Sequence, residues 1–186
     1  MIDTGDLRKG MTLDWDGRLV KVIDFAHNKQ GRGSAQVRLT VRDLRSGSTT
    51  QHSVQAGYRF TPVRLERQHV QYLYGEGGHL HFMDTETFDQ FILDEAAIGD
   101  AIKYIRENDT LDLLTYNGEP IDVELPTAVN LTVEQTEPGF KGDTATGGTK
   151  PATLETGLVV NVPLFVSTGD VIKVDTRTGE YLERVS

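Results

Sequence analysis

Apolar and polar residues alternate along much of this 186-residue chain, and this period of two constrains the fold more than any other feature. In residues 37–42, Val37, Leu39 and Val41 fall on one side and the polar residues on the other. Further runs on one side are Leu158, Val160, Val162, Leu164 and Val166, and also Val129, Leu131 and Val133. Successive side chains of a strand point to opposite faces, so the pattern predicts a chain built mainly of β-strands.

Turn-forming dipeptides separate several of these runs. They are Asp16-Gly17, Ser46-Gly47, Asn117-Gly118 and Thr178-Gly179. Asp-Gly and Asn-Gly are strong signals for two-residue hairpins, because both central residues of such a turn need a positive φ. The other two dipeptides are weaker signals of the same kind.

Residues 94–108 form the one segment with helical spacing. Its shared face consists of Ala97, Ala101, Tyr104 and Ile105, but Gly99 interrupts it. Glycine weakens a helix interior, so we expect short helical turns here and no long helix.

Strand-rich stretches of about 60 residues follow one another three times, although no strict sequence repeat is visible. Five-stranded barrels of the OB or a similar type fit this size. We therefore expect an all-β protein with domains at 1–63, 64–126 and 127–186, with Pro126 at the second boundary. Three such barrels in series make an elongated molecule if few contacts cross the boundaries.

Charge is distributed unevenly over these three segments. The first has 10 Lys and Arg against 6 Asp and Glu (+4), the second 4 against 14 (−10) and the third 5 against 8 (−3). A basic end on an acidic body can contact RNA with one part and be repelled elsewhere, which favours one docking orientation. The alternative is the uneven surface charge of an ordinary soluble protein.

Several classes of protein are disfavoured by what the sequence lacks. It has no cysteine, which excludes a disulfide scaffold and a thiolate metal site. The first six residues have neither the basic nor the apolar region of a signal peptide, and no apolar run is long enough to span a membrane. We expect a cytoplasmic protein without membrane contact.

No constellation of catalytic residues stands out either. His79 and His81 share a strand face, but Asp84 is the only further metal ligand nearby, so we expect no metal site. The glycine-rich stretch 142–148 lacks the Lys-Ser/Thr ending of a phosphate-binding loop. We expect no enzyme activity and no cofactor.

The most unusual local feature is a hairpin tip at residues 27–34, between strands expected at 19–25 and 35–44. Arg32 lies there between Gly31 and Gly33. Glycines allow positive φ and close approach of another surface, and arginine offers forked donors to phosphate and a plane for stacking on bases. The alternative is an ordinary hairpin tip with a solvated arginine.

Two more arginines extend this picture. Arg38 and Arg42 lie on one face of the following strand. From that position they could contact an RNA backbone.

The last third of the chain resembles the family signature of elongation factor P. The matching positions are Lys150, Ala152, Gly157, Val160, Val162, Pro163, Val166 and Gly169. Residues 142–148 resemble the third-domain loop of that family, with Thr146 where a basic residue is common. Residues 71–74, 82–84 and 171–181 also match, so the resemblance covers essentially the whole chain.

This resemblance implies a bacterial translation elongation factor. Members of the family have an SH3/KOW-like first barrel and two OB-fold barrels in an elongated L shape. They bind the 70S ribosome between the P and E sites, contact the peptidyl-tRNA and stimulate peptide-bond formation at polyproline stalls. We expect a monomer, since the factor has to enter the ribosome alone.

The resemblance also assigns roles to residues. Arg32 becomes the tip that reaches the peptidyl transferase centre, with Lys29, Gly31, Gly33 and Ser34 shaping it. The loop approaching the small subunit and the E-site codon contains Gly142, Asp143, Thr144, Gly147 and Gly148. Some arginine-type members are rhamnosylated at the tip, so Arg32 is a candidate for this modification and an arginine-modifying glycosyltransferase a candidate partner.

Two alternatives remain open. One is an elongation-factor-P-like paralogue with a different stall preference. The other is a generic RNA-binding OB-fold protein, in which Trp15, Phe25 and Tyr58 of the basic segment would serve as stacking platforms.

Overall fold

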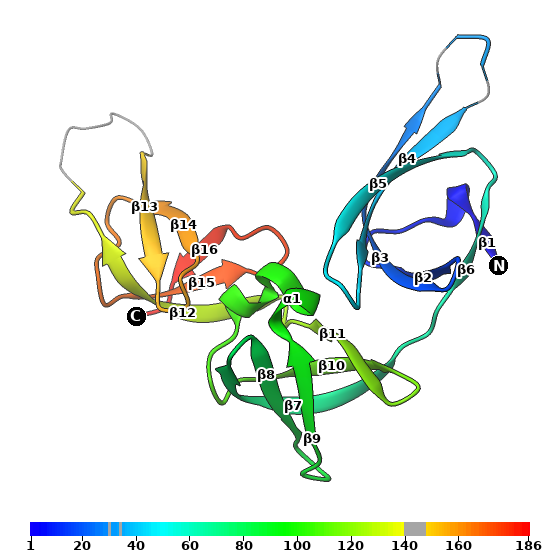
Figure 1. Ribbon diagram of the computed structural model, residues 1–186. Coiled ribbons are helices and arrows are strands. Elements are labelled where there is room, and N and C mark those ends of the chain that lie inside the picture. Colours follow the sequence, from blue (N-terminus) through cyan, green and yellow to red (C-terminus); the bar gives the residue numbers. More distant parts are fainter. Residues whose placement is uncertain (30, 34, 140–147) are drawn as a thin grey trace.

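The computed structural model describes residues 1–29, 31–33, 35–139 and 148–186, and it contains three antiparallel sheets that follow one another along the chain. Figure 1 shows them as three separate curled domains in a bent arrangement, with the middle one at the bend. The prediction of an all-β protein is confirmed.

The first sheet has six strands in the order β1-β6-β2-β3-β4-β5. These are β1 (Ile2–Asp3), β2 (Thr12–Trp15), β3 (Arg18–Asn28), β4 (Gln36–Asp43), β5 (Thr49–Gln55) and β6 (Arg59–Pro62), with a 3-10 turn η1 (Thr4–Asp6) after β1. Its core is formed by Leu7, Leu13, Val20, Val22, Val37, Leu39, Val41 and Phe60. The predicted alternation of Val37, Leu39 and Val41 is therefore confirmed.

The middle sheet has five strands in the order β11-β10-β7-β8-β9. These are β7 (Glu66–Glu76), β8 (His79–Asp84), β9 (Gln90–Asp94), β10 (Thr110–Tyr116) and β11 (Glu119–Glu124). Between β9 and β10 lie a one-turn helix α1 (Glu95–Ile98) and a 3-10 turn η2 (Gly99–Tyr104). The predicted short helical turns are thus confirmed, and Gly99 separates them with a φ of +57°.

The third sheet has five strands in the order β14-β13-β12-β15-β16. These are β12 (Ala128–Thr136), β13 (Thr149–Leu154), β14 (Val159–Pro163), β15 (Val171–Asp175) and β16 (Tyr181–Arg184). Of the predicted inward row, Val160, Val162 and Val166 are buried, whereas Leu158 and Leu164 are partly exposed.

The sheets are separated by short gaps at residues 63–65 and 125–127. The domain divisions expected after Val63 and after Pro126 lie in these gaps. At the first junction Leu19, Leu44 and Ile121 form a small buried cluster. At the second, Tyr104 packs against the core of the third domain.

Both strong hairpin signals form the expected turns. Asp16 and Gly17 have φ values of +52° and +82°, and Asn117 and Gly118 have +51° and +79°. Positive φ at both central residues matches the right-handed twist of the flanking strands.

One turn recurs in all three domains, at residues 43–48, 84–89 and 175–180. In each, the backbone N–H of the fifth residue donates to the carbonyl of the first, at 2.8, 3.0 and 2.8 Å. Further backbone N–H groups donate to the side chain of the leading aspartate, and they lower the pKa of Asp43, Asp84 and Asp175. The sequence showed no strict repeat because this turn fixes few residue types besides the aspartate.

Each domain also has one extra residue in its first long strand. The pairing shifts between Val22 and Asp24 in β3, between Tyr72 and Tyr74 in β7, and between Val133 and Gln135 in β12. Such bulges bend a strand and increase its local twist, which helps a short sheet to curl.

Candidate nucleic-acid interface

Strands β3 and β4 form a long antiparallel ribbon, whose end projects beyond the first barrel in Figure 1. Strand β5 pairs with the other side of β4, from Thr49 opposite Arg42 to Gln55 opposite Gln36. The pairing of β3 with β4 runs from Val20 opposite Asp43 to Asn28 opposite Gln36. Strand β3 continues three residues past its predicted end at Phe25, because the ladder with β4 continues where the barrel core ends. We call Lys29, Gly31, Arg32 and Gly33 the tip of this ribbon.

All four residues of the tip are exposed. Gly31 has a φ of +56°, and a Cβ atom there would have no heavy atom within 4 Å. Within the described part of the chain, no carboxylate lies at ion-pair distance from Lys29, Arg32 or Arg38. The tip thus presents the cation of Arg32 to solvent, as the sequence predicted, while Ser34 lies outside the described residues.

The sequence around the ribbon contains many more basic than acidic residues. Residues 25–65 contain seven Lys and Arg and a single carboxylate, Asp43. That carboxylate accepts hydrogen bonds from the N–H groups of Arg45 and Ser46 in its own turn. The nearest acid before this stretch, Asp24, pairs with Lys9 at 3.3 Å, and the hydrogen bond from Lys9 lowers the pKa of Asp24. A polyanion would therefore meet little repulsion along the ribbon.

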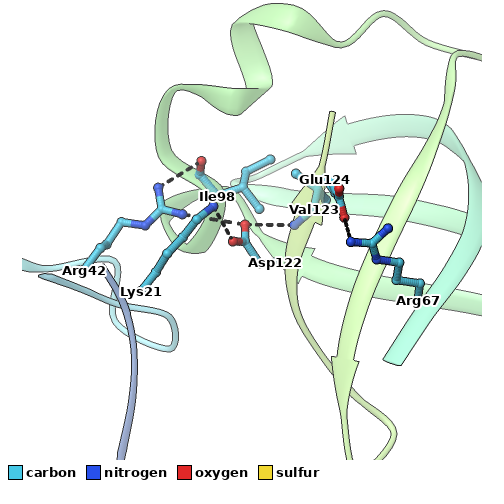
Figure 2. A network of polar contacts seen from close by, with 7 residues as sticks. All are labelled: Lys21, Arg42, Arg67, Ile98, Asp122, Val123 and Glu124. Carbon is cyan, nitrogen blue, oxygen red and sulfur yellow. Dashed lines mark hydrogen bonds and ion pairs between the residues drawn. The ribbon is translucent and has the colours of Figure 1, made fainter. Parts of the chain in front are cut away.

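Arg38 and Arg42 share the outer face of β4, as predicted, but the structure gives them different surroundings. Arg38 is exposed and opposite Ala26. The Arg42 side chain is only 16% exposed, lies 3.6 Å from the Asp122 carboxylate and donates to the Ile98 carbonyl at 3.3 Å (Figure 2). The guanidinium of Arg42 is thus engaged by the middle domain, and its contact with RNA stays a prediction.

The predicted loop of the third domain lies mostly outside the described residues, which include Gly148 but not Gly142, Asp143, Thr144 or Gly147.

The two ends of this loop are held by contacts that sequence reasoning missed. A Cβ on Gly139 would lie 2.3 Å from the Leu164 carbonyl oxygen, so only glycine fits there. The ammonium of Lys150, which is buried, donates to the carbonyl of Glu137. The sequence signal that could have revealed this is that Lys150 alternates with the apolar residues Ala152 and Leu154, and thus lies on the inward face of its strand.

The histidines of the middle domain have local partners. His79 Nδ1 lies 3.0 Å from Asp94 Oδ1, and the His81 ring stacks on Tyr74 with centroids 4.3 Å apart. In the part of the chain that the structure describes, no three metal-ligating side chains converge. No helix among those residues is long and apolar enough to cross a membrane.

Profiles of three protein-family domains match the chain in succession. They are the elongation factor P KOW-like domain at residues 3–60, the elongation factor P OB domain at 65–123 and the elongation factor P C-terminal domain at 129–184. The KOW-like and OB assignments agree with the barrel types expected from the sequence.

Curated relatives match along their whole length. Elongation factor P of Moorella thermoacetica is 52% identical over 184 residues, which is 99% of this chain and 100% of the relative. Elongation factor P of Herpetosiphon aurantiacus is 51% identical over 185 residues, covering 100% of both chains. Among solved structures, eukaryotic translation initiation factor 5A from Methanococcus jannaschii matches 66% of this chain and 92% of its own, with 18% identity and a TM-score of 0.45.

Family profiles over all three domains and relatives about half identical over the full length lead to one assignment. The chain belongs to the elongation factor P family of translation elongation factors, whose partner is the ribosome.

Proposed function

We propose that this chain binds the ribosome between the P and E sites and stimulates peptide-bond formation at polyproline stalls by positioning the P-site tRNA. The observation that carries this proposal is the exposed Arg32 between two glycines at the end of a long ribbon. The proposed contact joins Arg32 to the backbone of the tRNA acceptor end, with Lys29, Gly31, Gly33 and Ser34 shaping the approach.

The mechanism needs no acid, base or nucleophile from the factor. Proline is a constrained secondary amine, so its peptide bond forms slowly. Holding the acceptor end in reactive geometry lowers the entropic part of the barrier. A guanidinium suits this task because its planar donors fit phosphate oxygens in a defined geometry. The catalytic groups remain those of the ribosome.

Charge along the molecule supports one orientation of docking. The first domain carries a net charge of +4 and the middle domain −10. RNA would attract the first and repel the second, so the ribbon would lead the encounter. Arg38, exposed on the outer face of β4, would add a backbone contact behind the tip. The loop containing Gly142, Asp143, Thr144, Gly147 and Gly148 would approach the small subunit. The factor would act in the cytoplasm as a monomer.

Arg32 is also the proposed site of modification. It is exposed at the tip, where an arginine-modifying glycosyltransferase could reach it. Mass spectrometry of the protein from its own cell should then find one deoxyhexose on the peptide that contains Arg32. An unmodified peptide would mean that the bare guanidinium makes the contact.

The central test is the variant Arg32→Ala in a reconstituted translation system that makes a polyproline peptide. We expect it to lose stimulation while keeping its unfolding midpoint. Arg59→Ala is the matched control, since Arg59 is another exposed arginine of the first domain and lies on β6, outside the ribbon.

Three outcomes would contradict the proposal. Equal stimulation by Arg32→Ala and wild type would remove Arg32 from the contact. Relief of stalls other than polyproline would indicate a paralogue with a different preference. Salt-dependent binding to free single strands, with no preference for ribosomes that hold P-site tRNA, would indicate a general RNA-binding protein.

A further inference from the structure

Asp122 is a buried carboxylate whose cationic partners come from another domain. It lies on β11 of the middle domain with its side chain 3% exposed. Lys21 Nζ of the first domain donates to Asp122 Oδ2 at 3.0 Å, and Arg42 Nη2 lies 3.6 Å from Oδ1 (Figure 2). A buried charge is costly unless it is paired and hydrogen-bonded, so this carboxylate depends on the first domain.

The other contacts of these groups are to backbone. The N–H of Val123 donates to Asp122 Oδ1 at 2.8 Å, and Arg42 Nη1 donates to the Ile98 carbonyl at 3.3 Å. Within the described residues, no Lys, Arg or His of the middle domain pairs with Asp122. The charge balance of Asp122 is therefore complete only when the two domains are docked. We call Asp122, Lys21 and Arg42 the clamp.

The two cations of the clamp lie at the base of the ribbon that carries Arg32. Lys21 on β3 and Arg42 on β4 are cross-strand partners on its outer face. The seven residue-to-residue steps from Lys21 to Asn28 span about 23 Å at the usual rise of a strand. A tilt of about 10° at the base would then move the tip by about 4 Å, more than a hydrogen bond tolerates.

The remaining contacts of the junction are less directional. Leu19, Leu44 and Ile121 pack as an apolar cluster, which favours contact without fixing an angle. The ion pair of Arg45 with Glu119 has both side chains half exposed, and such pairs contribute little. Charge-assisted hydrogen bonds have a preferred geometry, so the bonds from Lys21 to Asp122 and from Arg42 to the Ile98 carbonyl can set direction, together with the close approach of Gly47 to Ala96.

We propose that Asp122 is a positioning residue, which holds the ribbon in the direction that brings Arg32 to the tRNA. The effect on translation rests on the function proposed above, whereas the effect on domain orientation does not. Asp122 touches neither RNA nor reacting atoms in this proposal and acts only through Lys21 and Arg42.

Spin-label distance measurements test the orientation directly. The chain has no cysteine, so labels can be attached at Ser53→Cys on β5 and Gln90→Cys on β9, both exposed. Asp122→Asn keeps the shape and removes the charge. Glu124→Gln is the matched control, because Glu124 lies on the same strand and its carboxylate pairs with Arg67 of its own domain at 2.9 Å.

We expect a narrow distance distribution for wild type and Glu124→Gln, and a broader or multimodal one for Asp122→Asn. An unchanged distribution for Asp122→Asn would overturn the proposal. Lys21→Met provides an independent route, since it leaves Asp122 and the middle-domain core intact and should also broaden the distribution. The double variant should broaden it no more than Asp122→Asn alone, because Asp122→Asn already removes the charge with which Lys21 pairs.

Translation kinetics separate the clamp from the tip. A ribbon that points correctly for only part of the time lowers the apparent affinity by that fraction. We expect Asp122→Asn to raise the concentration for half-maximal stimulation about tenfold with a near-normal maximum. Arg32→Ala should instead reduce the maximum. A broadened distance distribution with an unchanged half-maximal concentration would refute the positioning role alone. Absence of stimulation by wild type would refute the proposed function. The effect of the clamp on domain orientation would then be tested by the spin-label distances alone.

Discussion

Both ends of the β3–β4 ribbon carry basic residues, but one end contacts the middle domain and the other is exposed to solvent. At the base, the outer-face residues Lys21 and Arg42 pack against the middle domain. At the tip, Arg32 and its neighbours are exposed. Alternation along a strand assigns each side chain to a face, but whether that face is covered depends on what another domain places there. The difference shows that the base is part of the domain junction, whereas the tip is exposed to solvent.

The largest expected contrast is between the core under the base and the tip. Leu39→Ala removes a fully buried side chain and should lower the free energy of unfolding by about 2–5 kcal/mol. Arg32→Ala should change it by less than about 0.5 kcal/mol, because the side chain is exposed. Denaturant unfolding of both variants checks this, and a comparable loss in Arg32→Ala would break the comparison.

Glycines at the two ends give the second contrast. Gly47, in the turn after β4, has a φ of +77°, and a Cβ there would lie 2.2 Å from the Ala96 carbonyl oxygen. Gly47→Ala should therefore cost about 2–4 kcal/mol and disturb the junction. Gly31→Ala has open space around it and should cost only about 1 kcal/mol of backbone strain. Thermal unfolding ranks the two, and equal midpoints would contradict the close approach at Gly47.

The two arginines of β4 sharpen the comparison within one strand face. Arg42→Ala leaves the buried Asp122 with Lys21 as its one cationic partner among the described residues and should cost about 1.5–3 kcal/mol. Arg38→Ala should cost less than about 0.5 kcal/mol, since Arg38 is exposed. The same denaturant series measures both. A neutral Arg42→Ala would show that the clamp adds no net stability.

The smallest expected effect is on pH dependence at the base. Hydrogen bonds from the N–H of Ser46, and then of Arg45, lower the pKa of Asp43 from 3.8. A lowered folded-state pKa contributes stability that is present above about pH 4 and disappears as pH falls through the folded value. The stability difference between wild type and Asp43→Asn should therefore shrink below pH 4. A difference that is constant from pH 7 to pH 3 would exclude this contribution.

Local signals in the sequence predicted much of the fold. Asp16-Gly17 and Asn117-Gly118 specify their turns through backbone geometry that few other dipeptides adopt. Gly99 likewise marks the break between α1 and η2. Phe88 was not predicted to have a positive φ of 66°, because a bulky residue rarely adopts it. There the surrounding turn decides the conformation, and the residue type does not reveal it.

The exposure of the tip was predictable from the sequence, and the burial of Arg42 at the base was not. Arg32 was visible because its glycine neighbours form a local pattern. The role of Arg42 depends on Asp122, which is 80 positions away in the sequence and on a different sheet. A single sequence contains no signal for such a pairing, although an aspartate between Ile121 and Val123 in a strand was an anomaly that could have drawn notice.

The extra residue in β3, Ile23, affects the direction in which the ribbon points and leaves the pairing of β3 with β4 unchanged. Before Ile23 the outer-face residue is Lys21, and after it the outer-face residues are Asp24 and Ala26. The extra residue therefore shifts the alternation of inner and outer side chains by one position. Removing Ile23 would leave a regular ladder in which every residue keeps its cross-strand neighbour. What would change is the added bend and twist of the strand. A variant of this chain without Ile23 would therefore keep the residues of the tip but direct the ribbon differently.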